Sequence, residues 1–265
     1  MSAVARSTTE QIATITLDAP PVNALDPDGW TDIRSAVDDV SADEDVRAVV
    51  LSGMDGRFCA GANISVLAEP HDEAANMLRI VGEAADAIRA CRVPVIAAID
   101  GPAHGGGLEL ALACDIVVAS NRATFAASGV NMGLIASVPA LTTVVGVRRA
   151  SLMALTGKRI DADTAAEWGL VSVRDDDPTT AAGELAHKIA AKAPLAVEAN
   201  KAALRAHGSV TFAEHNELVT AAYTSLEQTN DHSEAVNAFL NKAATESGIN
   251  LWVAFHPDRG LLQLV

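Results

Sequence analysis

The chain has 265 residues, of which 49% are hydrophobic, 20% charged and 3% aromatic. This length favours one large domain, or a domain with an appendage, and the apolar fraction is too high for a disordered chain. The 19 basic and 34 acidic residues give a formal net charge of −15. That balance argues against nucleic acid and membranes as partners, because anionic polymers and surfaces select proteins rich in lysine and arginine.

The sequence predicts a cytoplasmic protein. Its longest apolar run, residues 93–99, is far shorter than the ~18 residues of a membrane-spanning helix. Residues 1–11 are polar and lack the apolar region of a signal peptide. The three cysteines are few and odd in number, so no disulfide framework is expected.

The first part of the chain alternates between strand-like and helix-like segments. Residues 11–17 alternate apolar and polar side chains, which is typical of a half-buried strand. Asp26 followed by Pro27 indicates the start of a helix that runs to about Val40. We expect further strands at 46–52, 93–100 and 114–120, and further helices at 73–90 and 108–113. Such alternation predicts an α/β layer.

A charged turn at residues 174–178 is the candidate domain boundary. We therefore expect a core over residues 1–175 and a helical region over residues 176–265. The predicted helices of this second region are 179–193, 194–207, 211–227 and 231–246. The final stretch, Leu251–Val265, is unusually apolar for a free terminus, and we expect it to pack against another protein surface.

Two glycine-rich segments, residues 56–64 and 100–109, each follow a predicted strand. Small residues allow a ligand to approach the backbone, and free amides at a helix start attract negative charge. The alternative is a pair of ordinary tight turns. The second segment lacks the Gly-Lys-Ser/Thr of a phosphate loop. Residues 104–107 read His-Gly-Gly-Gly, as in lipases, but no Gly-x-Ser-x-Gly nucleophile motif exists. The seven histidines show no metal-ligand spacing.

Four segments, in order along the chain, carry a resemblance to a known family. They are residues 22–25 (VNAL), 58–63 (FCAGAN), 96–116 (from IAAIDG through GGG to CDI) and 155–171 (from LTG to AAEWGLV). From about residue 10 to residue 242 the chain resembles the enoyl-CoA hydratase/isomerase (crotonase) family.

The resemblance implies a fold, a substrate and an assembly. The fold is an α/β spiral of strand–strand–helix repeats, followed by a C-terminal helical trimerisation region. The substrate is an acyl-CoA thioester, with coenzyme A as part of the substrate and no separate cofactor or metal. The expected assembly is a homotrimer or homohexamer.

The resemblance also assigns site residues. It places the backbone amides of Ala62 and Gly106 around the thioester oxygen as an oxyanion hole, where each donor contributes about 2.7–4 kcal/mol. Glu109 matches the first catalytic glutamate of the family; the alternative is an ordinary acid in a first helical turn. The residues expected to contact coenzyme A are Pro21, Val22, Ala24, Ala60, Ala62, Asn63, Ile64, Gly106, Phe239 and Lys242.

The second catalytic glutamate of the family is replaced by Gly129. Nearby Ser128, Asn131 and Ser137 are not carboxylic acids. One acid does not readily both activate water and protonate the α-carbon. Three hypotheses follow: a hydratase/isomerase, another crotonase reaction such as thioester hydrolysis or decarboxylation, or an acyl-CoA binding protein without turnover.

Other polar residues are weaker candidates. His104 is either a titrating group or a structural histidine under the loop. Cys59 is either a reactive thiol or a buried small hydrophobe. Residues 71–73 lie in a variable loop of the family and are candidates to reach the site, and Asp115 matches a family position that we interpret as structural.

Overall fold

The computed structural model describes residues 3–67, 71–135 and 137–247. The chain divides into two compact units, Met1–Arg205 and Ala206–Val265. In the described ranges, no helix is both long and apolar enough to cross a bilayer.

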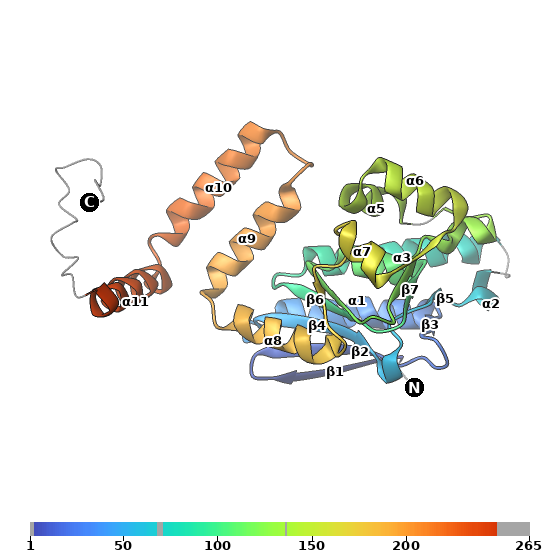
Figure 1. Cartoon of the computed structure of the whole chain (residues 1–265), viewed down its shortest axis with the longest axis horizontal. Coiled ribbons are helices and arrows are strands. Elements are labelled where there is room, and N and C mark those ends of the chain that lie inside the picture. Colours follow the sequence, from blue (N-terminus) through green and yellow to red (C-terminus); the bar gives the residue numbers. More distant parts are fainter. Residues whose placement is uncertain (1–2, 68–70, 136, 248–265) are drawn as a thin grey trace. The chain divides into compact units, whose positions relative to one another are not determined.

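A six-stranded sheet forms the base of the first unit (Figure 1). Its strands, in spatial order, are β1 (Val4–Thr9), β2 (Ile12–Leu17), β4 (Ala48–Gly53), β6 (Val95–Ile99), β8 (Ile116–Ala119) and β11 (Val173–Arg174). The pair β1–β2 is antiparallel, and all other pairs are parallel. The carboxyl ends of β2, β4, β6 and β8 therefore lie at one edge of the sheet.

A second layer consists of short strands that come after the long strands in the chain. It consists of β3 (Ala24–Leu25) paired with β5 (Gly61–Ala62), and of β7 (Pro102–His104), β9 (Thr124–Ala126) and β10 (Arg159–Asp161). Cys59 and Ala103 form a parallel bridge between the two sets. The strands β2, β4, β6 and β8 are each followed by a short strand of the second layer and then by a helical element, which is the expected spiral of strand–strand–helix repeats.

Helices cover both faces of the large sheet. On one face, α1 (Pro27–Ala42), α3 (His71–Ala90) and α4 (Gly106–Ala113) enclose the main core with the second layer. Asp26 caps α1 by accepting a hydrogen bond from Gly29 N, and Pro27 begins the helix. On the other face, Ala182 and Ala186 of α8 (Pro178–Ala190) pack on β4, β6 and β8.

Shorter elements complete the first unit, and two helices belong to the second. The first unit also contains η1 (Met54–Gly56), α2 (Ile64–Leu67), η2 (Ser128–Met132), α5 (Val138–Val145), α6 (Val147–Thr156), α7 (Ala162–Glu167) and α9 (Pro194–Ala206). The second unit contains α10 (Phe212–Leu226) and α11 (Asn230–Ser247). Thr211 and Glu214 form a capping box at the start of α10.

The division between units differs from the expected boundary at residues 174–178. Helix α8 packs on the large sheet, and α9 is tied to the core by Lys201 and Arg205, which form ion pairs with Asp115 at 2.9 and 2.7 Å. The first unit therefore extends to Arg205. Strand β1 and the short strands of the second layer do not stand out in the sequence, because β1 is mostly exposed and the others have two or three residues each.

Candidate active site

The two glycine-rich segments lie side by side, held by backbone hydrogen bonds. Phe58 N donates to Asp100 O at 2.8 Å, and Cys59 N donates to Pro102 O at 2.9 Å. His104 N donates back to Cys59 O at 3.1 Å. These bonds align the segment after β4 with the segment after β6, at the carboxyl edge of the sheet. This edge is the usual position for ligands in parallel sheets.

The alignment brings Gly61 close to Gly106. Asn63 N donates to Leu25 O of β3 at 2.8 Å. A Cβ built on Gly61 would lie 2.8 Å from His104 O and 3.1 Å from Gly106 N. The residue before Ala62 therefore packs against the peptide at the start of α4.

The peptide at Gly106 is held against an aromatic ring. Trp30 is fully buried, and its indole N–H donates to Leu25 O at 3.2 Å. A Cβ on Gly106 would lie 2.7 Å from atoms of that ring, so a side chain would displace either the ring or the loop. Glycine at this position thus lets the start of α4 approach the core closely.

The start of α4 supplies a favourable potential for negative charge. Gly105 is the N-cap residue, and its N–H donates a hydrogen bond to Ala126 O at 2.9 Å. The amide of Gly106 begins an eight-residue helix, where the helix dipole places partial positive charge. An oxyanion near this amide would be stabilised by both the hydrogen bond and the dipole.

Glu109 lies in the first turn of α4 and forms an ion pair with Arg89 of α3. Arg89 Nη2 donates to Glu109 Oε1 at 2.7 Å, and the two side chains are 29% and 17% exposed. The second guanidinium nitrogen, Nη1, contacts Asp86 Oδ1 at 2.8 Å. The carboxylate of Glu109 is therefore oriented by a cation that itself has two partners.

Gly129 lies in η2, which contains no acidic residue. Two hydroxyls approach the neighbouring loop instead. Ser128 Oγ lies 3.2 Å from a Cβ built on Gly105, and the buried Ser137 donates to Gly105 O over 3.4 Å. Ser137 has a φ of 60° and does not cap α5, although it is the N-cap residue.

Most of the residues expected to bind coenzyme A belong to two neighbouring segments, residues 21–25 and 60–64. Ala60 N donates to Val22 O at 3.1 Å, and β3 pairs with β5. Asn63 Oδ1 accepts from Ser65 N at 3.1 Å, so its side chain also supports the turn into α2. Pro21, Val22 and Ile64 are exposed, whereas Ala24, Ala60, Ala62 and Asn63 are half-buried.

The side chain of Asn23 connects the first of these segments to residues 57–58 by hydrogen bonds. Its side-chain amide donates to Arg57 O at 2.7 Å and Phe58 O at 3.1 Å, while its Oδ1 accepts from Ala19 N at 2.7 Å. Asn23 is almost fully buried, with a φ of 53°. Its hydrogen bonds connect the loop after β2 to the first glycine-rich segment.

His104 and Cys59 have structural surroundings. His104 Nε2 lies 3.0 Å from Thr124 Oγ1, and burial, with a smaller effect of the Arg159 charge, lowers the pKa of its imidazole. Burial raises the pKa of the Cys59 thiol to about 12. A thiol with this pKa is almost entirely protonated at neutral pH and is a poor nucleophile.

Two of the residues expected to contact coenzyme A belong to the second unit. Phe239 and Lys242 belong to α11 in the second unit, where Phe239 is exposed. The side chains of Lys242 and of residues 71–73, and the whole of Leu251–Val265, lie outside the described residues. Among the residues that the structure describes, no cluster of His, Cys, Asp or Glu could hold a metal ion.

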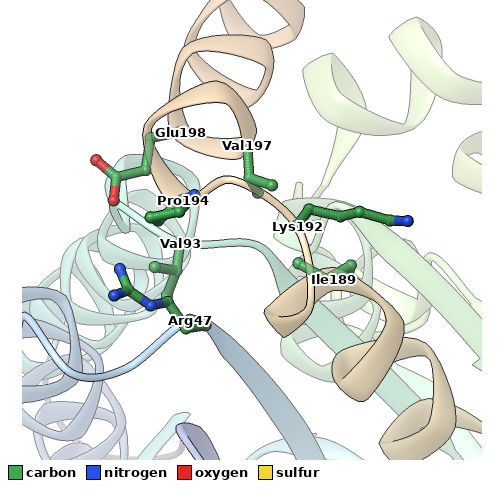
Figure 2. Close-up of a pocket in the computed structure, with 7 residues that line it drawn as sticks. All are labelled: Arg47, Val93, Ile189, Lys192, Pro194, Val197 and Glu198. Atoms are coloured by element: carbon green, nitrogen blue, oxygen red, sulfur yellow. The ribbon is translucent and has the colours of Figure 1, made fainter. Parts of the chain in front are cut away.

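One cavity lies at the opposite edge of the sheet, near the amino ends of β4 and β6. Figure 2 shows its lining, which includes Arg47, Val93, Ile189 and Glu198. Its volume is about 10 Å³, enough for one water molecule. It is too small for a substrate, and none of its lining residues belongs to the two glycine-rich segments.

Comparison with known proteins gives this geometry a family context. Residues 7–247 match the family described as enoyl-CoA hydratase/isomerase. The chain belongs to this family. The short-chain-enoyl-CoA hydratase of Clostridium acetobutylicum is 31% identical over 89% of this chain and 94% of its own length. The 2,3-dehydroadipyl-CoA hydratase of Escherichia coli is 34% identical over 91% and 97%, respectively.

Solved structures confirm the crotonase fold. DspI of Pseudomonas aeruginosa superposes with a TM-score of 0.88 and 34% identity, covering 91% of this chain and 95% of that protein. The enoyl-CoA hydratase of Bacillus anthracis gives a TM-score of 0.87 and 28% identity, covering 91% and 97%, respectively.

Sequence reasoning misses three residues around this site: Arg89, Trp30 and Asn23. Arg89 precedes Glu109 by twenty positions and belongs to another helix, so no local spacing connects them. Trp30 gives no signal beyond that of a core aromatic. Asn23 stands out only as part of a motif, although a polar residue within an apolar segment after two prolines is a recognisable sign of a structured turn.

Proposed function

We propose that this protein is an enoyl-CoA hydratase/isomerase-type enzyme that binds an acyl-CoA thioester and stabilises its enolate, in fatty-acid or related acyl-CoA metabolism. The observation that supports the proposal is the approach of Gly61 to Gly106 N, which brings the residue before Ala62 against the start of α4. In this proposal both amides donate to the thioester oxygen, and coenzyme A lies along residues 21–25 and 60–64.

Glu109 is the proposed catalytic acid–base group. It moves the α-proton or activates water, while the enolate oxygen is held by the two amides and the dipole of α4. The family relatives named above are hydratases, which supports hydration as the reaction. Gly129 supplies no second acid, and this favours reactions that need only one, namely thioester hydrolysis or decarboxylation. Binding without turnover is the remaining alternative.

A comparison of two variants at one position tests the binding site. In Gly106→Ala and in Gly106→Pro, the added Cβ meets Trp30 in the same way, but only proline removes the N–H donor. Calorimetric titration with crotonyl-CoA should give saturable binding to wild type and weaker binding to the proline variant than to the alanine variant. Equal affinities of the two folded variants would contradict the proposed role of this amide.

Turnover then separates the alternatives. Wild type should be incubated with enoyl-, 3-hydroxyacyl- and malonyl-type CoA thioesters, with products identified by mass spectrometry. Addition of water to crotonyl-CoA supports a hydratase, release of free coenzyme A supports a thioesterase, and loss of CO₂ supports a decarboxylase. Saturable binding without any product supports the acyl-CoA binding protein.

A homotrimer or homohexamer is part of the proposal. Helix α10 contains no buried residue, and Phe212 and Tyr223 are 80% and 65% exposed. An exposed apolar surface of this kind favours contact with another protein surface. Phe239 and Lys242 of α11 would then meet the nucleotide of coenzyme A in the assembly. Light scattering at micromolar concentration should give at least a trimer, and a stable monomer would contradict this expectation.

A cytoplasmic location is also part of the proposal. Its support is that Cys59, Cys91 and Cys114 are all free and buried, a pattern suited to a reducing compartment.

A further inference from the structure

The ion pair between Arg89 and Glu109 is more buried than the pair between Arg79 and Glu83 of α3. Arg89 lies in the last turn of α3, with both terminal nitrogens of its guanidinium engaged, one by Asp86 and one by Glu109. The Arg79–Glu83 pair on the same helix is more exposed, at 59% and 34%. A partly buried, charge-assisted hydrogen bond of 2.7 Å holds its groups more firmly than an exposed pair.

The pair engages only one oxygen of the carboxylate. Arg89 binds Oε1 of Glu109, whereas Oε2 makes no hydrogen bond to any residue in the described part of the chain. Glu109 N donates to Gly105 O at 3.1 Å, so the same helical turn carries both the carboxylate and the amide of Gly106. The guanidinium therefore fixes the orientation of the free oxygen relative to that amide.

We propose that Arg89 is a positioning residue that acts through Glu109, holding Oε2 toward the α-carbon of the bound acyl group. This inference rests on the proposed function. In the step it serves, Oε2 accepts the α-proton and the C–H bond breaks. The electron pair forms the C=C bond of the enolate, and the thioester oxygen takes the negative charge. The carboxyl of Glu109 exchanges this proton with solvent and then delivers a proton, or a deuteron in D₂O, to carbon, which completes a cycle that needs no second acid, oxidant or reductant.

Exchange of the α-protons of butyryl-CoA in D₂O measures this step directly, because the exchange requires only the base and the oxyanion site. We expect exchange by wild type and a rate about 10–100-fold lower in Arg89→Gln, the range expected when a catalytic group is misplaced. The calorimetric Kd for butyryl-CoA should stay unchanged, since Arg89 touches no substrate atom in this proposal. Arg89→Lys, which keeps the charge, should recover part of the rate.

A double-mutant cycle tests whether Arg89 acts through Glu109. In the Glu109→Gln background, Arg89→Gln should cause no further loss of exchange. Arg79→Gln, on the same helix but in the exposed pair, is the matched control and should exchange like wild type. Thermal unfolding of every variant identifies any loss of fold.

Three results would overturn the inference. The first is wild-type exchange by folded Arg89→Gln, and the second is an additive loss in the double variant. The third is wild type that binds butyryl-CoA without exchanging its protons, which leaves the binding proposal intact. If wild type does not bind acyl-CoA at all, the proposed function fails together with this inference.

Discussion

The carbonyl oxygen of Cys59 lies 2.0 Å from the position that a Cβ on Gly107 would occupy. The first turn of α4 therefore packs directly on the backbone of the neighbouring glycine-rich segment. His104 N also donates to this carbonyl, at 3.1 Å. The contact explains why the start of α4 tolerates no side chain at Gly107, and it fixes the spacing between the two segments that carry Ala62 and Gly106.

Substitution of Gly107 should be costly. Gly107→Ala forces the two segments apart, and we expect the free energy of unfolding to fall by about 3 kcal/mol, at the upper end of typical overpacking. The control is Gly82→Ala in α3, where an added Cβ meets nothing within 4 Å and should stabilise the helix by about 0.5–1 kcal/mol. Denaturant titrations at one protein concentration compare the two. Equal stabilities would contradict the close packing of Gly107 on Cys59.

Restoring an acid at position 129 should increase hydration of crotonyl-CoA. Gly129 lies in η2 and is not among the described residues with positive φ, so its backbone conformation does not require glycine. We expect slow hydration by wild type and an increase in Gly129→Glu of up to about 10²–10⁴-fold, the usual contribution of a general acid or base. The rate is measured from the loss of the enoyl absorbance.

Two variants control this experiment. Val130→Glu adds the same charge at an exposed neighbour and should leave the rate unchanged. Glu109→Gln combined with Gly129→Glu should lose the gain. Should wild type already hydrate as fast as Gly129→Glu, another residue supplies the acid and our interpretation of position 129 is wrong.

Asp115 anchors α9 to the core, and its removal should destabilise the first unit. Its carboxylate pairs with the buried Lys201 at 2.9 Å and with Arg205 at 2.7 Å, and it accepts from Val95 N at 2.8 Å. Asp115→Ala leaves the ammonium of Lys201 buried without its counter-charge, which should cost about 3–5 kcal/mol.

The exposed pair of Arg34 and Glu83 is the comparison for Asp115. Glu83→Ala also breaks the exposed pair with Arg79, and it should still cost no more than about 1 kcal/mol, because exposed ion pairs are weak. Thermal and urea unfolding of both variants test the difference. Similar losses of stability in the two would show that burial of Lys201 carries no special cost.

The three cysteines should resist alkylation in the native state. Burial is the largest effect on each thiol: it raises the pKa of Cys59 to about 12, and it raises the pKa of Cys91 and of Cys114. Thiolate is the reactive form, so iodoacetamide at pH 8 should label none of them until urea is added. Mass spectrometry locates the label. Rapid labelling of native Cys59 would indicate an accessible thiol beside Ala60.

Much of the first unit is predictable from local patterns. The strand at 11–17, the helix after Asp26 and the strands near 46–52 and 93–100 are recognisable because each carries a continuous periodic or capping signal, and all are present. The sequence also places Gly129 at the position of the family's second glutamate, because the match to the family needs no gap between Phe125 and Gly129. The alignment of Ala62 with Gly106 is expected only through the family resemblance.

The sequence by itself determined the class of fold, the family and the two glycine-rich segments, because these depend on periodicity and on residues close together in the chain. Only the tertiary structure decided what those segments face. The bonds from residues 58–59 to residues 100–104, the Trp30 ring behind Gly106 and the pairing of Arg89 with Glu109 join positions that are far apart in the sequence. Such contacts arise when packed layers bring separate elements to one edge, and no local spacing encodes them.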